Sequence, residues 1–462
     1  MKDHSPAAGR HDNGRIVAVL MLSGFVGSLS QNMLTSALPA IMEDYQISAA
    51  VGQWLTTSYI LVMGIITAIS AFLFYRFNTK RLVLCSLALF MAGCLIALWA
   101  PGFPVLLAAR ILQAVGAGPL IPLLQIAVLH LYPPERQGFA LGLTGIIVGF
   151  APAVGPTLSG VLMDHFGWRS VFVFLVILCA AAFAAGQLVL RDIGQRKETR
   201  LSAISIALYS AGFILVMLSV TWMKGGAFLS PRVLLGLAAG AAALVLFVRK
   251  QNREEDPFLR LSLLRHRSLV LACFLLGTAY VLNMAGTILV PLFNQTICTY
   301  TATASGLLLL PGSLVIALCS PVSGKLTDRF GARRVCLAGM AANILGNLLF
   351  LTFTPETGPW PIAAAYGFRG LGMALVMTPS SALAVQDVAL EDKAHAMAIL
   401  NSFRKMSGFL FSTILVIIAT VASLPSSAIN LHGVHMAFLA MTILSAAGLA
   451  ASFAVHPPRS RP

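Results

Sequence analysis

The sequence predicts an all-α polytopic membrane protein with fourteen transmembrane helices. Three observations support this fold class: the composition of the chain, its division into long apolar runs, and the placement of its basic residues. Of 462 residues, 58% are hydrophobic and 10% are charged, whereas soluble domains are about a quarter charged. A soluble fold could not cover so much apolar surface, so we expect the chain to lie in a lipid bilayer.

The apolar runs each approach the roughly 20 residues that a helix needs to cross the hydrocarbon core. The first run is too long for a signal peptide, and we interpret it as an uncleaved helix. The fourteen runs are Ile16–Leu38, Val51–Phe74, Leu82–Ala100, Pro104–His130, Gly138–Met163, Ser170–Leu190, Leu201–Trp222, Pro231–Val248, Leu269–Phe293, Thr303–Gly324, Val335–Phe353, Pro361–Val385, Ala396–Val421 and Val434–Val455.

Basic residues concentrate at both termini and after the even-numbered runs, and the opposite loops hold little beyond Arg169, Lys224 and Arg232. Loops rich in arginine and lysine face the cytoplasm, so we expect both termini there. The net charge of +15 would also suit a nucleic-acid-binding protein. Because the basic residues form no continuous stripe, we expect no nucleic-acid partner.

Two segments at cytoplasmic helix ends share serine, leucine, arginine and phenylalanine at the same spacing, Ser70–Leu82 and Ser323–Val335. Such a repeat predicts two parallel six-helix halves, with the substrate bound near the midplane between them. The predicted organisation is a disordered cytoplasmic tail (residues 1–14), an N-terminal half (15–190), two inserted helices with a cytoplasmic linker (191–268), a C-terminal half (269–455) and a second cytoplasmic tail (456–462).

Three motifs resemble those of the major facilitator superfamily. They are Gly324-x-Leu326-x-Asp328-Arg329-x-Gly331-x-Arg333 after the tenth run, Arg110-x-x-Gln113-x-x-Gly116 in the fourth, and Gly155-Pro156-x-x-x-Gly160 in the fifth. With fourteen runs, the chain resembles the drug:proton antiporter branch, and Gln53–Ile65 resembles its lincomycin-resistance exporters. The resemblance implies a major-facilitator fold, a bacterial inner (plasma) membrane, a monomer, and a proton gradient in place of a cofactor.

Each motif has a physical interpretation. Asp328 can pair with neighbouring arginines or with a helix amino terminus, which favours a carboxylate; the Gly324–Arg333 segment would then latch one conformation. Gly155, Pro156 and Gly160 would let the fifth helix bend and approach a neighbour closely, and plain tight packing is the alternative.

The resemblance implies that Arg110 and Gln113 couple transport to protons. Since an unpaired arginine inside a membrane is costly, we expect Arg110 to face the interior and hydrogen-bond to Gln113 or to the first helix. The alternative is that it snorkels from a helix end. For Arg369, near the start of the twelfth run, we expect snorkelling.

No acidic residue lies within any of the runs, and the first run has Ser30-Gln31-Asn32 where relatives generally carry an acid. Coupling would then use Arg110, a histidine such as His130, or a loop acid such as Asp328. A site without negative charge is suited to neutral or anionic amphiphiles. The candidate cavity residues are Ser30, Gln31, Asn32, Gln125 and Asn283, and we expect Asn343 and Asn347 to form hydrogen bonds between helices.

These features favour a secondary-active exporter of small hydrophobic compounds or drugs that works by alternating access. The alternative is a facilitator or importer of a small metabolite on the same fold. An enzyme is not expected, because the sequence shows neither a cluster of catalytic residue types nor a phosphate-binding Gly-x-x-x-x-Gly-Lys loop. A metal site is not expected either, since His432 and His435 have no further ligand nearby in the sequence.

Overall fold

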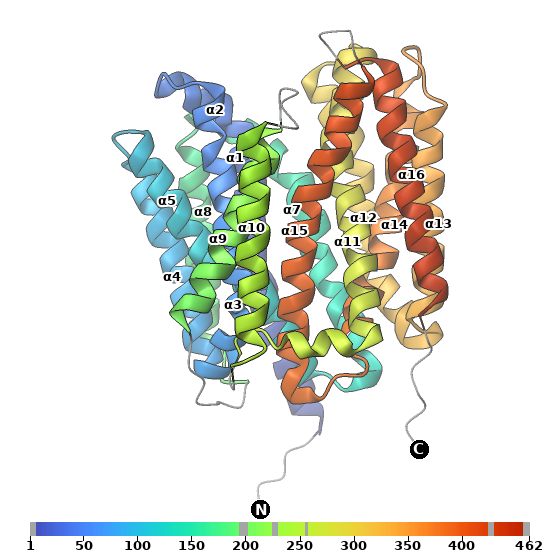
Figure 1. The fold of residues 1–462 in the computed structure, drawn as a ribbon. Helices are drawn as coiled ribbons and strands as arrows, with labels where there is room; N and C mark the ends of the chain where they lie inside the picture. Colours follow the sequence, from blue (N-terminus) through green and yellow to red (C-terminus); the bar gives the residue numbers. More distant parts are fainter. Residues whose placement is uncertain (1–5, 194–201, 224–229, 255–256, 424–428, 456–462) are drawn as a thin grey trace, which may run out of the picture. The chain divides into compact units, whose positions relative to one another are not determined.

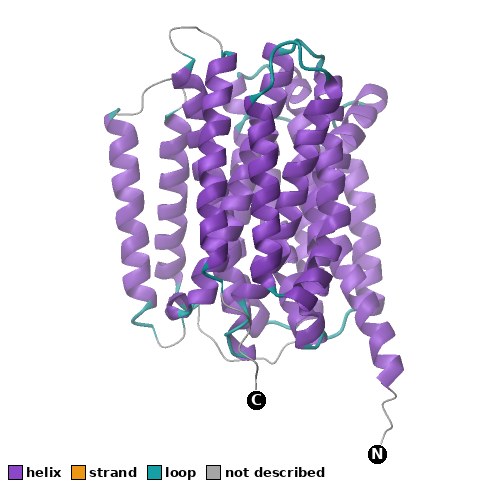
Figure 2. Ribbon diagram, turned by 90° about the vertical axis from the view of Figure 1, so that its right-hand side faces the viewer, coloured by secondary structure: helices purple, strands orange, loops and turns teal. Residues whose placement is uncertain are grey.

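The computed structural model describes residues 6–193, 202–223, 230–254, 257–423 and 429–455. Within these ranges every regular element is a helix and no strand occurs (Figure 1, Figure 2). The first eight α-helices are α1 (Pro6–Asp44), α2 (Ala49–Gly52), α3 (Trp54–Arg76), α4 (Thr79–Leu98), α5 (Phe103–Ala117), α6 (Leu120–Leu131), α7 (Gln137–Phe166) and α8 (Ser170–Val189).

The other α-helices are α9 (Ala203–Trp222), α10 (Pro231–Gln251), α11 (Arg267–Leu292), α12 (Ala302–Phe330), α13 (Ala332–Leu351), α14 (Pro359–Ala384), α15 (Lys393–Ala422) and α16 (Leu431–Phe453). Four short helical turns complete the set, η1 (Pro134–Arg136), η2 (Leu261–Arg265), η3 (Phe293–Ile297) and η4 (Leu390–Asp392).

In the described chain, 13 helical segments are long and apolar enough to cross a membrane. They correspond to all of the predicted spans except the twelfth, and α5 and α6 together form the fourth. Helix α14 takes the place of the twelfth span. It has 26 residues, among them Arg369, three glycines and an internal proline, Pro379.

Helix α1 begins at Pro6, so residues 6–14 continue the helix rather than forming the disordered tail that the sequence predicts. Polar contacts hold this extension in place. The side-chain amide of Asn13 donates to the Leu131 carbonyl at 3.0 Å, and its oxygen accepts from Arg191 at 3.1 Å. A prediction based on apolar runs cannot detect a helix end that is held by polar contacts.

The chain divides into two compact units. Unit 1 comprises Met1–Pro134, Phe150–Leu201 and Lys393–Ala398; unit 2 comprises Glu135–Gly149, Ser202–Asp392 and Ile399–Pro462. Within unit 1, α4 packs against α5 and α8. Within unit 2, α14 packs against α12 and α13, and α9 packs against α10 (Figure 1). The predicted domain boundaries stay a prediction.

Local sequence explains where several helices begin. Five residues that precede a helix accept a hydrogen bond from the backbone N–H three positions on, namely Asn78, Ser202, Ser230, Thr301 and Asn430. Such caps satisfy an N–H group that has no partner inside the helix. Between α12 and α13, Gly331 adopts a φ of +80°, which a residue with a side chain rarely adopts.

The internal repeat includes a close contact between two helices, which is formed by α4 and α5 in unit 1 and by α13 and α14 in unit 2. In unit 1, a Cβ on Gly93 of α4 would lie 2.7 Å from Cγ of Gln113 in α5. In unit 2, a Cβ on Gly346 of α13 would lie 2.7 Å from Cγ of Arg369 in α14. The offset between Gly93 and Gly346 is the one that relates Ser70 to Ser323. The repeat therefore preserves the close approach of the third and fourth helices of each half.

In unit 2, the start of α7 packs its glycines directly against the backbone of α12. A Cβ on Gly142 would lie 2.5 Å from the Ser320 carbonyl oxygen, and one on Gly149 would lie 2.5 Å from the Ala317 amide nitrogen. Gly138 likewise abuts Gly324 of α12. Small residues allow this approach because no side chain separates the two backbones.

We expect Gly142→Ala to destabilise the protein, because the added methyl group has no space beside the Ser320 carbonyl. Overpacking of this kind costs about 1–3 kcal/mol. Gly160→Ala is the matched control, since a Cβ at Gly160 on the same helix meets nothing within 4 Å. Thermal unfolding of both variants in detergent, followed by size-exclusion fluorescence, measures the difference. Equal melting temperatures would contradict the close α7–α12 contact.

Candidate functional site

Arg110 of α5 is the largest fully buried side chain of the described chain, with 1% of its surface exposed. Its Nη1 donates to Ser30 Oγ of α1 at 2.8 Å and to Gln113 Oε1 at 2.6 Å. The guanidinium carbon lies 4.1 Å from the centre of the Tyr59 ring of α3. The expected interior position and both expected partners of Arg110 are therefore observed, and the snorkelling alternative is wrong.

The Arg110 network contains only neutral partners, and some of its donors are unused. Nε and Nη2 of Arg110 and Nε2 of Gln113 are buried without a hydrogen-bond partner in the described residues. The Tyr59 hydroxyl donates to the Gly27 carbonyl at 2.8 Å and so fixes the ring beneath the guanidinium. An acceptor that reaches this cluster would find three buried donor nitrogens still to be satisfied.

Arg369 of α14 is buried as well, with 4% of its surface exposed, so the prediction that it snorkels is wrong. Nη1 donates to Asn347 Oδ1 of α13 at 2.6 Å, and Nη2 donates to the Leu282 carbonyl of α11 at 2.5 Å. A Cβ on Gly286 would collide with this guanidinium. The arginine is accommodated because a glycine on the neighbouring helix leaves room for it.

Asn347 joins helices as expected, because its amide also donates to Ser445 Oγ of α16 at 3.1 Å. Asn343 behaves differently. Among the described residues, the one hydrogen bond observed for its side chain runs to the Gly339 carbonyl of its own helix, at 3.3 Å. Its amide packs against Gly372 of α14 without bonding across the interface. The prediction of an interhelical hydrogen bond is therefore confirmed for Asn347 and wrong for Asn343.

Two further cations lie inside a membrane-spanning helix, and the sequence analysis did not single them out. Arg404 and Lys405 occupy the middle of α15, and Arg404 is 4% exposed. The Arg404 guanidinium lies 5.2 Å from the centre of the Tyr280 ring of α11. Two adjacent basic residues inside the predicted run Ala396–Val421 were the signal that could have revealed this pair.

Asp328 contacts a helix amino terminus, one of its two expected partners. Its carboxylate accepts from the Gly138 and Phe139 N–H groups at the start of α7, both at 2.9 Å. Lys325 lies 5.2 Å from the Phe139 ring centre. The motif arginines contact rings instead of Asp328: Arg329 lies 5.1 Å from Phe330, and Arg333 lies 6.0 Å from Phe453.

The fifth span contains one close contact where two were expected. A Cβ on Gly155 would lie 2.8 Å from Asn32 Cβ of α1, and the Ser159 hydroxyl donates to the Met33 carbonyl at 2.9 Å. Gly160 has open space around it, so the expected close approach at that position is wrong. Helix α7 continues through Pro156 without a break.

The predicted cavity residues are distributed over both units. Ser30 is buried in the Arg110 network, and Gln125 of α6 is buried as well. Gln31 and Asn32 are part-exposed on α1, where the Asn32 amide donates to the Ser28 carbonyl at 2.7 Å. Asn283 is part-exposed on α11 of unit 2, one turn after Tyr280. Their assignment to substrate binding stays a prediction.

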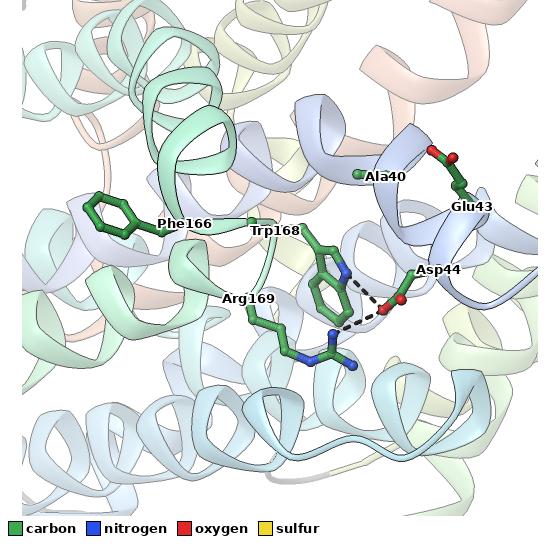
Figure 3. A pocket seen from close by; sticks show the side chains of 7 residues that line it. Ala40, Glu43, Asp44, Phe166, Trp168 and Arg169 are labelled. Atoms are coloured by element: carbon green, nitrogen blue, oxygen red, sulfur yellow. Dashed lines mark hydrogen bonds and ion pairs between the residues drawn. The ribbon is translucent and has the colours of Figure 1, made fainter.

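An open hollow in unit 1 lies at the end of α1 and between α7 and α8 (Figure 3). Asp44 points into it and accepts from Arg169 at 3.0 Å and from Trp168 Nε1 at 3.1 Å. The ion pair neutralises both charges, and both side chains are more than 40% exposed. These properties suit a contact that fixes the α7–α8 junction better than a substrate site.

The family model of the Major Facilitator Superfamily matches residues 20–412 and 313–462. The chain belongs to the major facilitator superfamily. It is 33% identical over 450 residues to the MFS-type transporter YcnB of Bacillus subtilis, covering 96% of this chain and 95% of that protein. It is 30% identical over 395 residues to the lincomycin resistance protein LmrB of Bacillus subtilis, covering 85% and 82%.

Among solved structures, the human organic anion transporter MFSD10 (TETRAN) matches with a TM-score of 0.68 and 13% sequence identity. The match covers 95% of this chain and 99% of that one, and at this identity it supports the fold alone. The major-facilitator fold predicted from the motifs is confirmed. The chain is a multi-pass membrane transporter and not an enzyme.

The charged groups inside the spanning helices of the described chain are of one sign. Every acidic residue of the described ranges lies in a loop or near a helix end, whereas Arg110, Arg369 and Arg404 are buried within spanning helices. Within the described residues, no group of histidine, cysteine, aspartate and glutamate could hold a metal ion. The charged groups available to a substrate inside the described helices are therefore cations.

We expect Asn347→Ala to reduce stability more than Asn343→Ala. The first change removes an acceptor from the buried Arg369 guanidinium and breaks the bond to Ser445, which we expect to cost about 1–3 kcal/mol. The second removes only a bond within α13. Melting temperatures of the two purified variants provide the comparison, and an equal loss in both would show that Asn347 does not support Arg369.

Proposed function

We propose that this transporter is a secondary-active exporter of small hydrophobic compounds, driven by proton antiport and working by alternating access. The observation that carries the proposal is the buried Arg110 network, which has neutral partners and unused donors. The likeness to the lincomycin resistance protein LmrB supports drugs as substrates. The antiporter motif residues Gly155 and Pro156 support exchange rather than uptake.

The unused donors of Arg110 provide a means of linking substrate to conformation. Each buried donor without a partner costs about 1–3 kcal/mol. A conformation that admits water or a substrate acceptor to this cluster recovers part of that cost, so occupancy shifts the balance between conformations. Gln113 takes part because its own amide nitrogen is equally without a partner.

The proton needs a different carrier, because a guanidinium remains charged at physiological pH. Asp328 is suited to this task. Its carboxylate holds the start of α7 through two N–H groups, and protonation would remove the charge that makes these hydrogen bonds strong. A proton on Asp328 would then loosen the contact between α7 and α12 and promote the change of conformation. His130 is the alternative carrier.

The same proposal places the chain in the inner (plasma) membrane of a bacterium, with both termini in the cytoplasm and with the monomer as the working unit. The basic loops after the even-numbered spans support this orientation. A site lined by cations and neutral groups favours neutral or anionic compounds, because a cationic drug would be repelled in a low dielectric.

The test is drug tolerance in a bacterial host that lacks its own efflux pumps. We expect the wild type to protect against some neutral or anionic compounds of a panel that includes lincomycin. We expect Arg110→Ala to abolish protection at equal membrane expression, because the remaining groups cannot replace the guanidinium. Arg136→Ala removes an exposed arginine after α6 and is the matched control, for which we expect unchanged protection.

Everted vesicles then test the coupling. A compound against which the wild type protects cells is added to energised vesicles. It should release protons from the lumen of vesicles that contain the wild type but not of those that contain Arg110→Ala. If the wild type protects against nothing on the panel, the exporter proposal fails. Accumulation of a metabolite by intact cells would then support the facilitator or importer. Protection of cells without proton release from the vesicles would reject proton antiport but retain the exporter.

A further inference from the structure

Arg404 and Lys405 place two adjacent positive charges in the middle of α15, a helix that crosses the membrane. Ion pairs observed among the described residues include Arg169–Asp44, Lys250–Glu254 and Arg260–Asp392. None of them includes either cation. Charged side chains at membrane depth are costly and rare, and they mark pathways for substrates or ions. The pair therefore requires a physical explanation.

Snorkelling does not explain Arg404, because only 4% of its surface is exposed. Its guanidinium lies over the Tyr280 ring of α11, and a Cβ on Gly408, one turn further along α15, would collide with that ring. Ring and guanidinium are thus held together by close packing of α11 and α15. Within the described residues, no side-chain hydrogen bond from Arg404 is observed, and its Nε is buried without a partner.

The contrast with the other two buried arginines is informative. Arg110 and Arg369 each donate two hydrogen bonds to neutral oxygens, so they are partly satisfied by the protein itself. Arg404 has only the face of an aromatic ring, which leaves the N–H groups in the plane of its guanidinium open. Lys405, next to it, is part-exposed and adds a second positive charge.

Neutral polar groups accompany this pair on the facing helix. Asn283 lies one turn after Tyr280 on α11 and is part-exposed. At Gly277, one turn before Tyr280, α11 contacts Ser407 of α15, whose hydroxyl would lie 3.1 Å from an added Cβ. The α11–α15 pair thus combines two cations, an amide, a hydroxyl and an aromatic ring on helices rich in apolar side chains. An acidic group attached to an apolar body matches this combination.

We propose that Arg404 and Lys405 bind the carboxylate or sulfonate of an amphiphilic anion, which is the substrate class of this transporter. The inference rests on the proposed transport function and narrows it from neutral or anionic compounds to anionic ones. The planar guanidinium can hold both oxygens of a carboxylate, and the low dielectric strengthens the attraction. The apolar body of the ligand lies along α11 and α15.

Two dyes with the same aromatic skeleton provide the test. Anilinonaphthalene sulfonate is an amphiphilic anion, and N-phenylnaphthylamine is the same molecule without the sulfonate. Binding is measured by fluorescence on the purified full chain in phosphatidylcholine nanodiscs, with empty discs subtracted, so that no anionic headgroup competes. We expect saturable binding of the sulfonate to the wild type. Arg404→Gln or Lys405→Gln should weaken its affinity about tenfold, because each change removes one charge-assisted contact.

The neutral dye and one surface variant are the controls. Arg249→Gln removes an exposed cation at the end of α10, and we expect it to bind the sulfonate as the wild type does. We also expect N-phenylnaphthylamine to bind all variants equally, which shows that they are folded. Should Arg404→Gln not fold, Lys405→Gln decides, since its side chain is part-exposed. If Lys405→Arg binds the sulfonate as the wild type does while Lys405→Gln does not, the positive charge at this position is the requirement.

Equal sulfonate binding by the wild type and both glutamine variants would overturn the proposal. So would an equal loss of both dyes, or an equal effect of Arg249→Gln. Binding in discs requires no transport, so the two proposals fail separately. A wild type that protects cells but binds no sulfonate would retain the exporter and lose the anion site. Charge-selective binding without protection would retain the site and lose the exporter.

Discussion

The guanidinium of Arg110 lies 4.1 Å from the centre of the Tyr59 ring, with hydrogen bonds to the neutral oxygens of Ser30 and Gln113. Arg369 and Arg404 repeat the contact with Phe438 and Tyr280, at 5.4 and 5.2 Å. An aromatic face attracts a cation without neutralising it. Each helix thus carries its arginine into the membrane with its charge intact, and the neighbouring helices supply a ring for all three and neutral oxygens for Arg110 and Arg369.

Much of the fold could be predicted because its causes are local in the sequence. A run of about 20 apolar residues is sufficient to define a span, and Gln113 is one helical turn from Arg110, so their contact follows from helix geometry. The burial of Arg369 depends instead on Gly286 and Gly346. These glycines lie on two other helices and leave space for its side chain. The residues next to Arg369 in the sequence do not predict that space. Arg404 and Lys405 differ again, because averaging over a long apolar run concealed them.

The two halves share helix contacts but not the position of their charge. By the spacing that pairs Gly116 of α5 with Gly372 of α14, Arg369 stands at the place of Gln113, and Tyr366 stands at the place of Arg110. Tyr366 packs its ring against Gly312 of α12, the repeat position of Tyr59. A tyrosine ring is therefore present at this level of both units, supplied by the second helix in one and by the fourth in the other. Both units thus contain a tyrosine ring at this level, on different helices, while the arginine differs in position by one turn.

The cytoplasmic motif also makes a similar contact in both halves with different side chains. Asp328 holds the start of α7 through two backbone N–H groups. Its repeat position is Tyr75, whose ring lies 5.6 Å from that of His395 at the start of α15. Each half thus touches the first turn of a long helix, one with a carboxylate and the other with a ring. A carboxylate at a helix amino terminus responds to protons and to salt, whereas ring packing depends mainly on apolar contact. The second-half contact therefore contains a carboxylate that a proton can neutralise, while the first-half contact contains none.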